Sequence, residues 1–277
     1  MVIVNPLDVF LWTIRRNDKD VIALYRTLSP IMQLATGGSM LNFGLWSSQH
    51  NQPALAQDNL CSFFGDFSDL NNANKVIDVG SGLSAPALFW KNQYPHLCLY
   101  CININFVQMT HAKTNNDMIL INSTSTRLPF TDNSVDRVLA LESAQHFKPL
   151  REFLFESKRI LKDTGLLTLA MPITTRNASI IDLGILKFTW SSEQYSSEYV
   201  QDSVVSAGFT ISKKQLIGSQ VYEPLADYYI QNRETLKKLI QKEYPTYVEP
   251  ILYKSILKMK DASKKNIIDY VLLKCTK

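Results

Sequence analysis

Several features that would assign the chain to a membrane or secreted class are missing from its 277 residues. No apolar run approaches the roughly 18 residues that a helix needs to cross a bilayer. The first 16 residues are apolar early and basic late, the reverse of a secretory signal. They predict a short amphipathic helix that docks on the core or touches a membrane surface, and docking is the favoured reading. A cytoplasmic location is therefore expected.

Cysteine is also scarce, with four in the chain. Cys98 and Cys101 have the spacing of a redox or zinc pair, but they belong to "LCLYCINI", a stretch typical of a buried strand. Residues three apart on a strand point to opposite faces, so the two sulfurs cannot share a ligand. No second pair completes four ligands. Neither a metal site nor a redox role is predicted.

The net charge of the chain is small. The 29 basic residues exceed the 25 acidic ones by four, and the lysines are spread along the chain. Nucleic-acid binders usually carry a denser basic stripe, so no nucleic-acid partner is expected. The hydrophobic fraction of 45% and the charged fraction of 19% suit a globular protein with one substantial core.

Strands alternate with helices over most of the chain. Short apolar runs predict strands, and helical patterns lie between them. The expected strands are 75–80, 97–104, 117–122, 136–142 and 165–171, and the expected helices are 85–94, 106–115 and 149–161. This succession favours a mainly parallel sheet covered by helices on both faces.

The remaining segments extend this pattern. A helix over 193–207, a strand over 208–217, a helical region over 222–260 and a closing strand over 266–277 are expected. The region between the last two strands is longer than a simple connection needs, which indicates a cap over a site. We expect one domain: a helical lid over 1–70, a core over 71–221, the cap over 222–262 and the closing strand over 263–277.

The stretch "VIDVGSGLSAPALF", residues 76–89, joins an apolar strand to a glycine turn and a helix. It lacks the lysine and hydroxyl of a phosphate-gripping loop, and the third place of a G-x-G-x-x-G pattern falls on Ala85. A tight turn without any ligand remains an alternative. Asp78, however, stands at the edge where such sheets bind ligands. Its carboxylate would repel a pyrophosphate and would suit a cationic ligand.

This stretch resembles motif I of class I S-adenosylmethionine-dependent methyltransferases, in the branch that acts on small molecules. Ser84 and Ala85 replace the last two glycines of that motif, and Pro86 and Ala87 match it. Four further stretches are similar to the family's motifs in the same order along residues 41–172. They are "LNFGLW", "CININFVQMTHA", "INSTSTRLPFTDNSVDRVLALESAQHF" and "RILKDTGLLTLAMP".

The resemblance implies an α/β fold, with a Rossmann-like, mostly parallel sheet of seven strands, an N-terminal helical segment and a helical cap. It implies S-adenosylmethionine as the cofactor. Asn103 falls where most of the family carries an acid that holds the ribose, and Thr124 replaces the acid beside the adenine. The cofactor-binding residues implied are Phe43, Trp46, Asp78, Gly80, Gly82, Asn103, Ile104, Gln108, Thr124, Ser125 and Leu141.

His146 is the candidate general base, because an imidazole is well matched to proton abstraction near neutral pH. It lies just after the fourth strand, and the alternative is a histidine that packs or orients the substrate. Glu142 can orient His146, bind a polar substrate or cap the next helix.

The favoured function is methylation of a small-molecule acceptor, with oxygen preferred because His146 offers a base. The alternatives are a lipid, quinone or sterol C- or N-methyltransferase, and a binding protein that has lost catalysis. Nothing in the sequence specifies the acceptor, and a homo-oligomer is compatible with it.

Overall fold

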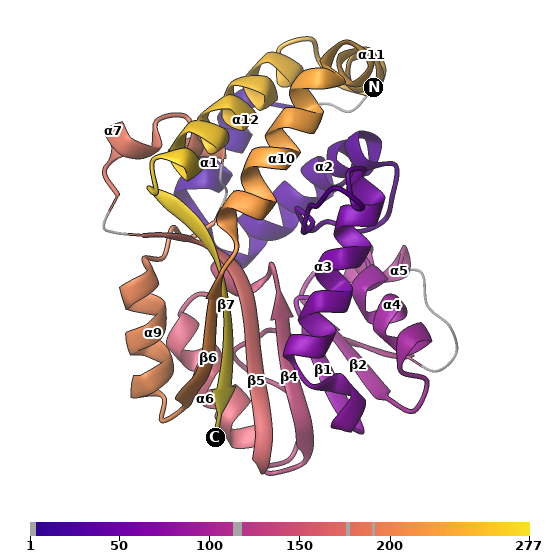
Figure 1. The fold of residues 1–277 in the computed structure, drawn as a ribbon, viewed down its shortest axis with the longest axis vertical. Coiled ribbons are helices and arrows are strands. Elements are labelled where there is room, and N and C mark those ends of the chain that lie inside the picture. Colours follow the sequence, from indigo (N-terminus) through magenta and orange to yellow (C-terminus); the bar gives the residue numbers. More distant parts are fainter. Residues whose placement is uncertain (1–3, 113–117, 176–177, 190–191) are drawn as a thin grey trace.

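One sheet organises the fold, with the strand order β3-β2-β1-β4-β5-β7-β6 (Figure 1). The structure, a computed structural model, describes residues 4–112, 118–175, 178–189 and 192–277. The strands are β1 Lys75–Val79, β2 Cys98–Asn103, β3 Met118–Asn122, β4 Val135–Leu141, β5 Leu161–Thr174, β6 Thr210–Leu216 and β7 Ile268–Thr276. The first five run parallel, and β7 lies antiparallel between β5 and β6. The expected Rossmann-like, mostly parallel sheet of seven strands is therefore present.

Helices cover both faces of the sheet because successive side chains of each buried strand point to opposite sides. In β1, Val76 belongs to the core beneath α3 and α4, whereas Ile77 and Val79 belong to the core beneath α6 and α9. These helices are α3 Pro53–Phe67, α4 Ala85–Gln93, α6 Leu150–Ile160 and α9 Ser197–Ser206. Near-continuous apolar runs in the central strands thus build two cores at once.

Two of the expected helices are shorter than their sequence patterns. The helix expected over 106–115 is α5, Phe106–Thr110, and residues 113–117 lie outside the described residues. The helix expected from residue 193 begins at Ser197, where the Ser196 side chain accepts a hydrogen bond from the Tyr199 amide at 3.1 Å. A serine in this position satisfies one of the free amides of the first turn, which fixes the start of the helix.

The expected cap between the last two strands is a set of three helices, α10 Gly218–Gln231, α11 Arg233–Glu243 and α12 Val248–Lys264. It begins four residues earlier than the sequence pattern predicts. The carboxylate of Glu249, which is fully buried, accepts hydrogen bonds from Arg233 at 2.9 and 3.3 Å and so ties α11 to α12. Figure 1 shows α10 and α12 above the end of the sheet.

The N-terminal segment is helical as expected and reaches toward the same end of the sheet (Figure 1). It contains α1 Pro6–Arg15, α2 Asp18–Thr36, α3 and the short helix η1 Leu70–Asn72. Asn17 starts α2 through a reciprocal capping box with Asp20. The hydroxyl of Tyr244, the residue that follows α11, donates to the Thr27 carbonyl of α2 at 2.9 Å, so the cap and α2 are joined directly.

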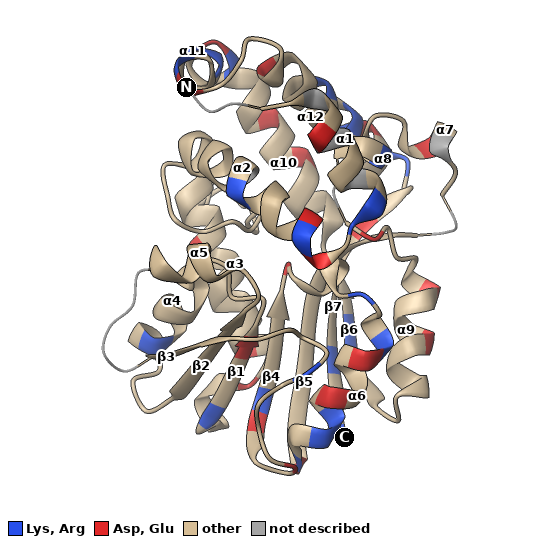
Figure 2. Ribbon diagram, turned by 180° about the vertical axis from the view of Figure 1, so that it is seen from behind, with Lys and Arg blue, Asp and Glu red and all other residues tan. Residues whose placement is uncertain are grey.

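Short helices complete the chain: η2 Ala144–His146, α7 Ile180–Leu183 and α8 Leu186–Thr189. Basic and acidic residues are interspersed over the ribbon (Figure 2). Within the described residues, no helix combines the length and the apolar character required to cross a membrane. Cys98 is exposed and Cys101 is buried, and in the described part of the chain no three potential metal ligands gather.

Candidate active site

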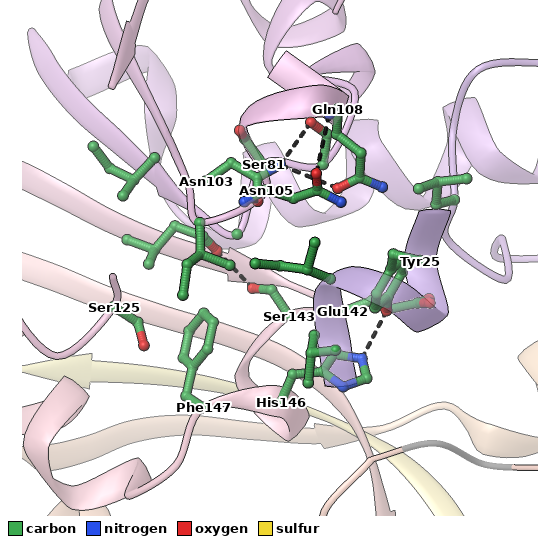
Figure 3. Close-up of a pocket in the computed structure, with 18 of the residues that line it drawn as sticks. Tyr25, Ser81, Asn103, Asn105, Gln108, Ser125, Glu142, Ser143, His146 and Phe147 are labelled. Atoms are coloured by element: carbon green, nitrogen blue, oxygen red, sulfur yellow. Dashed lines mark hydrogen bonds between the residues drawn. The ribbon is translucent and has the colours of Figure 1, made fainter. Parts of the chain in front are cut away.

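A pocket opens at the carboxyl end of the parallel strands, where β1, β2 and β4 stop beneath α2. Open α/β sheets bind their ligands at this edge. Ten of the residues singled out in the sequence contribute to its wall: Gly80, Gly82, Asn103, Ile104, Gln108, Thr124, Ser125, Leu141, Glu142 and His146. Figure 3 shows Asn103, Asn105 and Gln108 at one end of the pocket and Tyr25 and His146 at the other.

The turn after β1 is shaped by its glycines. Gly80 has φ +77°, and a Cβ built there would lie 2.4 Å from the Cβ of Ser143. Gly82 has φ +57° and open space around it, with the nearest atom of Leu41 at 3.6 Å. Only glycine adopts this backbone region freely, and at Gly80 the close approach of Ser143 also excludes any side chain. The backbone of the turn therefore forms part of the pocket wall.

Ser84 also has a positive φ, +57°, in the place where the resembling motif carries glycine. Its side chain is completely buried, and its hydroxyl donates to the Ser81 hydroxyl at 3.3 Å. The turn thus keeps a glycine-like shape at a serine, at a conformational cost of about 1–2 kcal/mol.

Asp78 does not form part of the wall. Its side chain is 3% exposed, within β1 between Cys101 and Leu139 of the neighbouring strands. Burial raises the pKa of this carboxyl to about 7, because removal from water disfavours the charged form. Asp78, expected to meet the ligand directly or through a water, thus lies within the strand and behind the residues that line the pocket.

The end of the pocket near β2 is a network of amides. Asn103 donates to the Gly82 carbonyl at 2.9 Å and to Oε1 of Gln108 at 3.2 Å. Its own Oδ1 accepts the Asn105 backbone amide at 3.0 Å. An amide oxygen has two lone pairs, so Asn103 retains one acceptor position for a hydroxyl hydrogen.

Asn105 begins α5, and its Oδ1 accepts the Gln108 amide at 3.2 Å. Its Nδ2 is buried and has no hydrogen-bond partner among the described residues. A buried amide donor without a partner costs about 1–3 kcal/mol, which is a sign of a missing ligand. Sequence reasoning did not single out Asn105, although an asparagine just after a strand and three residues before glutamine is a recognisable helix start.

The donor set of the pocket suits S-adenosylmethionine. Asn103, Asn105, Thr124 and Ser125 offer neutral donors and acceptors of the kind that bind hydroxyls and a purine. Ile104 and Leu141 supply apolar wall beside them. The polar network and the orphaned Asn105 amide therefore fit the ribose and adenine of this cofactor.

Glu142 follows β4 with φ +51° and connects three parts of the chain. Its Oε1 accepts the Phe43 amide at 2.9 Å and the Tyr270 hydroxyl at 3.0 Å. Burial raises the pKa of Glu142 to about 8, against the opposing effect of these two hydrogen bonds. Near neutral pH the carboxyl is mostly protonated, and it fixes the N-terminal segment and β7 against the pocket.

His146 ends η2 and faces Tyr25 of α2. The Tyr25 hydroxyl lies 2.6 Å from Nε2 of His146, and the two rings meet edge to face at 5.1 Å (Figure 3). Burial, and then the nearby Glu142, raises the pKa of Tyr25 well above its usual range. The phenol is therefore neutral, and in the tautomer with an unprotonated Nε2 it donates to His146.

Phe43 and Trp46, expected among the cofactor-binding residues, lie behind the wall and pack against the cap. The Phe43 ring meets Tyr222 of α10 edge to face at 5.9 Å. The Trp46 ring lies 5.6 Å from that of Tyr228, and its Nε1 donates to the Phe43 carbonyl at 2.9 Å. The neighbouring Leu41 and Asn42 form the wall instead. The aromatic residues thus fasten this segment to α10.

Tyr25 and Ser29 are the functional candidates that sequence reasoning missed. Both lie in α2, which was expected only as part of the helical lid over residues 1–70, with no functional residue named in it. Val21, Ile22, Tyr25 and Ser29 recur at the spacing of one helix face, and that periodicity was the available signal. It does not reveal that the face meets His146.

The sequence is similar to those of known methyltransferases. Residues 77–169 match the methyltransferase domain family. The chain is 21% identical over 263 residues to erythromycin 3''-O-methyltransferase of Saccharopolyspora erythraea, covering 86% of this chain and 85% of that protein.

Solved structures share the fold at low sequence identity. The cyclopropane synthase MmaA2 from Mycobacterium tuberculosis has a TM-score of 0.79 and 16% identity, covering 94% of this chain and all of that chain. Geranyl diphosphate methyltransferase, solved with geranyl diphosphate and sinefungin, has a TM-score of 0.77 and 9% identity, covering 96% and 99%.

Proposed function

Because the chain is a class I S-adenosylmethionine-dependent methyltransferase, we propose that it methylates an oxygen atom of its small-molecule acceptor, with His146 as the general base. The cofactor supplies a methyl group already activated on a sulfonium. The residues of this chain have to hold the acceptor in line with that methyl group and remove the hydroxyl proton. Positioning alone accounts for several kcal/mol of such a barrier.

The observation that carries the proposal is the 2.6 Å contact between the Tyr25 hydroxyl and Nε2 of His146. While the phenol donates to the imidazole, its oxygen can accept a hydrogen bond from an acceptor hydroxyl. The acceptor proton passes to the Tyr25 oxygen as the phenol proton passes to Nε2. The acceptor oxygen would then bond to the methyl carbon as the carbon–sulfur bond breaks and leaves a neutral thioether, and the relayed proton would remain on His146 as imidazolium.

The rest of the wall supports this division of roles. Asn103, Asn105, Thr124 and Ser125 would hold the ribose and adenine, and the turn at Gly80 and Gly82 would carry the methionine end. Glu142, mostly protonated below pH about 8, keeps the wall closed around the pocket through Phe43 and Tyr270. Closure matters because water competes with an acceptor hydroxyl for the methyl group and for the base.

A second candidate is a lipid, quinone or sterol acceptor methylated at carbon or nitrogen. It is favoured by the apolar side of the pocket, where α2 contributes Val21 and Ile22, and Leu41 and Phe147 lie nearby. The names of the structural neighbours include a cyclopropane synthase and a geranyl diphosphate methyltransferase. An apolar acceptor methylated on a hydroxyl would fit the same apolar wall but would belong to the first candidate.

The product identifies the methylated atom. The protein is incubated with S-adenosylmethionine bearing a deuterated methyl group and a metabolite extract, then separated into aqueous and organic fractions. We expect a labelled product whose tandem spectrum places the methyl group on oxygen. A label on carbon or nitrogen would replace the leading candidate with the second, and the absence of any labelled product would reject both for that extract.

A further inference from the structure

A chain of buried side chains connects the cofactor end of the pocket to α2. Asn103 donates to Gln108 at 3.2 Å, and Nε2 of Gln108 donates to the Ser29 hydroxyl at 3.0 Å. The three side chains belong to residues that are 6%, 8% and 7% exposed, respectively. Water cannot readily replace these bonds, so loss of one leaves an unpaired buried group. A change in how firmly Asn103 is held is therefore passed through Gln108 to Ser29.

Helix α2 carries this connection toward His146. Ser29 follows Tyr25 by four residues, so the two side chains lie on the same face of the helix. At one end of that face Ser29 accepts from Gln108, and one turn earlier Tyr25 contacts His146. Pro30 follows immediately and lacks the amide that would bond the Arg26 carbonyl, which weakens the helix at this point. The position of α2 therefore depends on the contacts that its side chains make.

We propose that Gln108 and Ser29 are positioning residues that transmit cofactor occupancy to Tyr25 and His146 through α2. A ribose hydroxyl that donates to the remaining lone pair of Asn103 fixes that amide, and Gln108 and Ser29 are fixed in turn. Helix α2 then holds Tyr25 against Nε2 of His146. The role of this contact in proton removal rests on the proposed function, whereas the ordering of α2 by the cofactor does not.

The test uses S-adenosylhomocysteine, which lacks the transferable methyl group and needs no acceptor. Amide hydrogen exchange over residues 18–36 is measured with and without this ligand, and its affinity is measured by calorimetry. The variant Ser29→Ala removes the hydroxyl that Gln108 contacts. The matched control is Thr27→Val. The Thr27 hydroxyl donates within α2 to the Ala23 carbonyl at 3.0 Å and does not contact Asn103, Gln108 or Ser29.

In the wild type and in Thr27→Val, the ligand should slow exchange across α2. In Ser29→Ala the ligand should still bind, weakened by no more than about tenfold, as expected for one hydrogen bond, but α2 should gain no protection. The ring signals of His146 in nitrogen-correlated spectra should move on ligand addition in the first two proteins and stay unchanged in Ser29→Ala. A merely structural role for Ser29 would leave this response intact.

Gln108→Met removes the hydrogen bonds of Gln108 to Asn103 and Ser29, and it replaces Ser29→Ala if that variant fails to fold. It should likewise uncouple α2 from the ligand. Equal protection of α2 in wild type and Ser29→Ala would overturn the inference, as would ligand binding that never protects α2. Failure of the wild type to bind the ligand would instead contradict the cofactor assignment on which the proposed function stands. The two failures are thus distinguishable.

Discussion

The hydroxyl of Tyr25 lies 2.6 Å from Nε2 of His146, and this contact joins the N-terminal segment to the loop after β4. The two residues are 121 positions apart in the chain, and only the folding of α2 across the sheet edge brings them together. A phenol so placed can relay a proton without leaving the imidazole. The contact therefore links the lid to the chemistry of the site.

Tyr25→Phe should keep cofactor binding and lose most of the turnover. The substitution removes the relay oxygen and leaves the ring packed against His146. We expect a fall in kcat of about 10²-fold, the lower end of the range for acid–base groups, and an unchanged affinity for S-adenosylhomocysteine. Turnover assays with the identified acceptor test this. Retention of full activity in Tyr25→Phe would show that the acceptor reaches His146 directly.

Gly80→Ala should disrupt the turn. The new methyl group would meet the Cβ of Ser143 at 2.4 Å in a backbone region with φ +77°. Strain and overpacking together should destabilise the protein by about 3 kcal/mol, measured by chemical denaturation. Gly38→Ala is the control, because a Cβ there meets only Oε1 of Gln57 at an ordinary 3.6 Å. Similar losses in both variants would contradict the steric explanation.

At Ser84 the strain already present can be removed, the reverse of the change at Gly80. Ser84→Ala removes the hydroxyl and keeps the strained φ of +57°, whereas Ser84→Gly removes both the hydroxyl and the strain. The glycine variant should therefore be more stable than the alanine variant by about 1 kcal/mol in denaturant unfolding. A more stable alanine variant would mean that the turn tolerates a side chain without strain.

Stability should fall as the pH rises from about 5 to about 8. The pKa of Glu142 is raised from 4.5 to about 8 and that of Asp78 from 3.8 to about 7. Between each pair of values the folded state binds more protons than the unfolded state, so raising the pH favours unfolding. Each such carboxyl contributes a slope of up to about 1.4 kcal/mol per pH unit.

Glu142→Gln isolates the contribution of Glu142, because a glutamine oxygen can still accept from Phe43 and Tyr270. Melting temperatures recorded across this pH range should decline less steeply in the variant than in the wild type. Identical slopes would show that Glu142 does not titrate in this interval. Asp78 contributes to the slope that remains in the variant, together with Asp58, whose pKa burial also raises.

The sequence predicts the sheet and the residues at the β2 end of the pocket, because local patterns determine where both lie. Apolar runs mark the strands, and the glycine turn and the segment around Asn103 follow strands directly, which places Gly80, Gly82, Asn103 and Gln108 at one edge. The position of the cap was predictable from its length, although not its division into three helices.

The other half of the site depends on contacts between distant segments. Phe43 and Trp46 belong to the helical lid expected over residues 1–70, but their packing against Tyr222 and Tyr228 places them behind the wall of the pocket. Tyr25 contacts His146 from α2, a helix that also contacts Tyr244 beside the cap and Gln108 across the pocket. Burial of Asp78 likewise depends on its neighbouring strands, and no local pattern of residues shows such long-range packing.

His146→Ala removes the imidazole proposed as the general base and leaves the pocket wall otherwise intact. Binding of S-adenosylhomocysteine is measured by calorimetry and transfer of a deuterated methyl group by mass spectrometry, on the same preparations of wild type and variant. We expect equal affinity for the ligand and a loss of methyl transfer of at least about 10²-fold, the contribution of a general base. Methyl transfer at the wild-type rate by His146→Ala would contradict the role of His146 as general base.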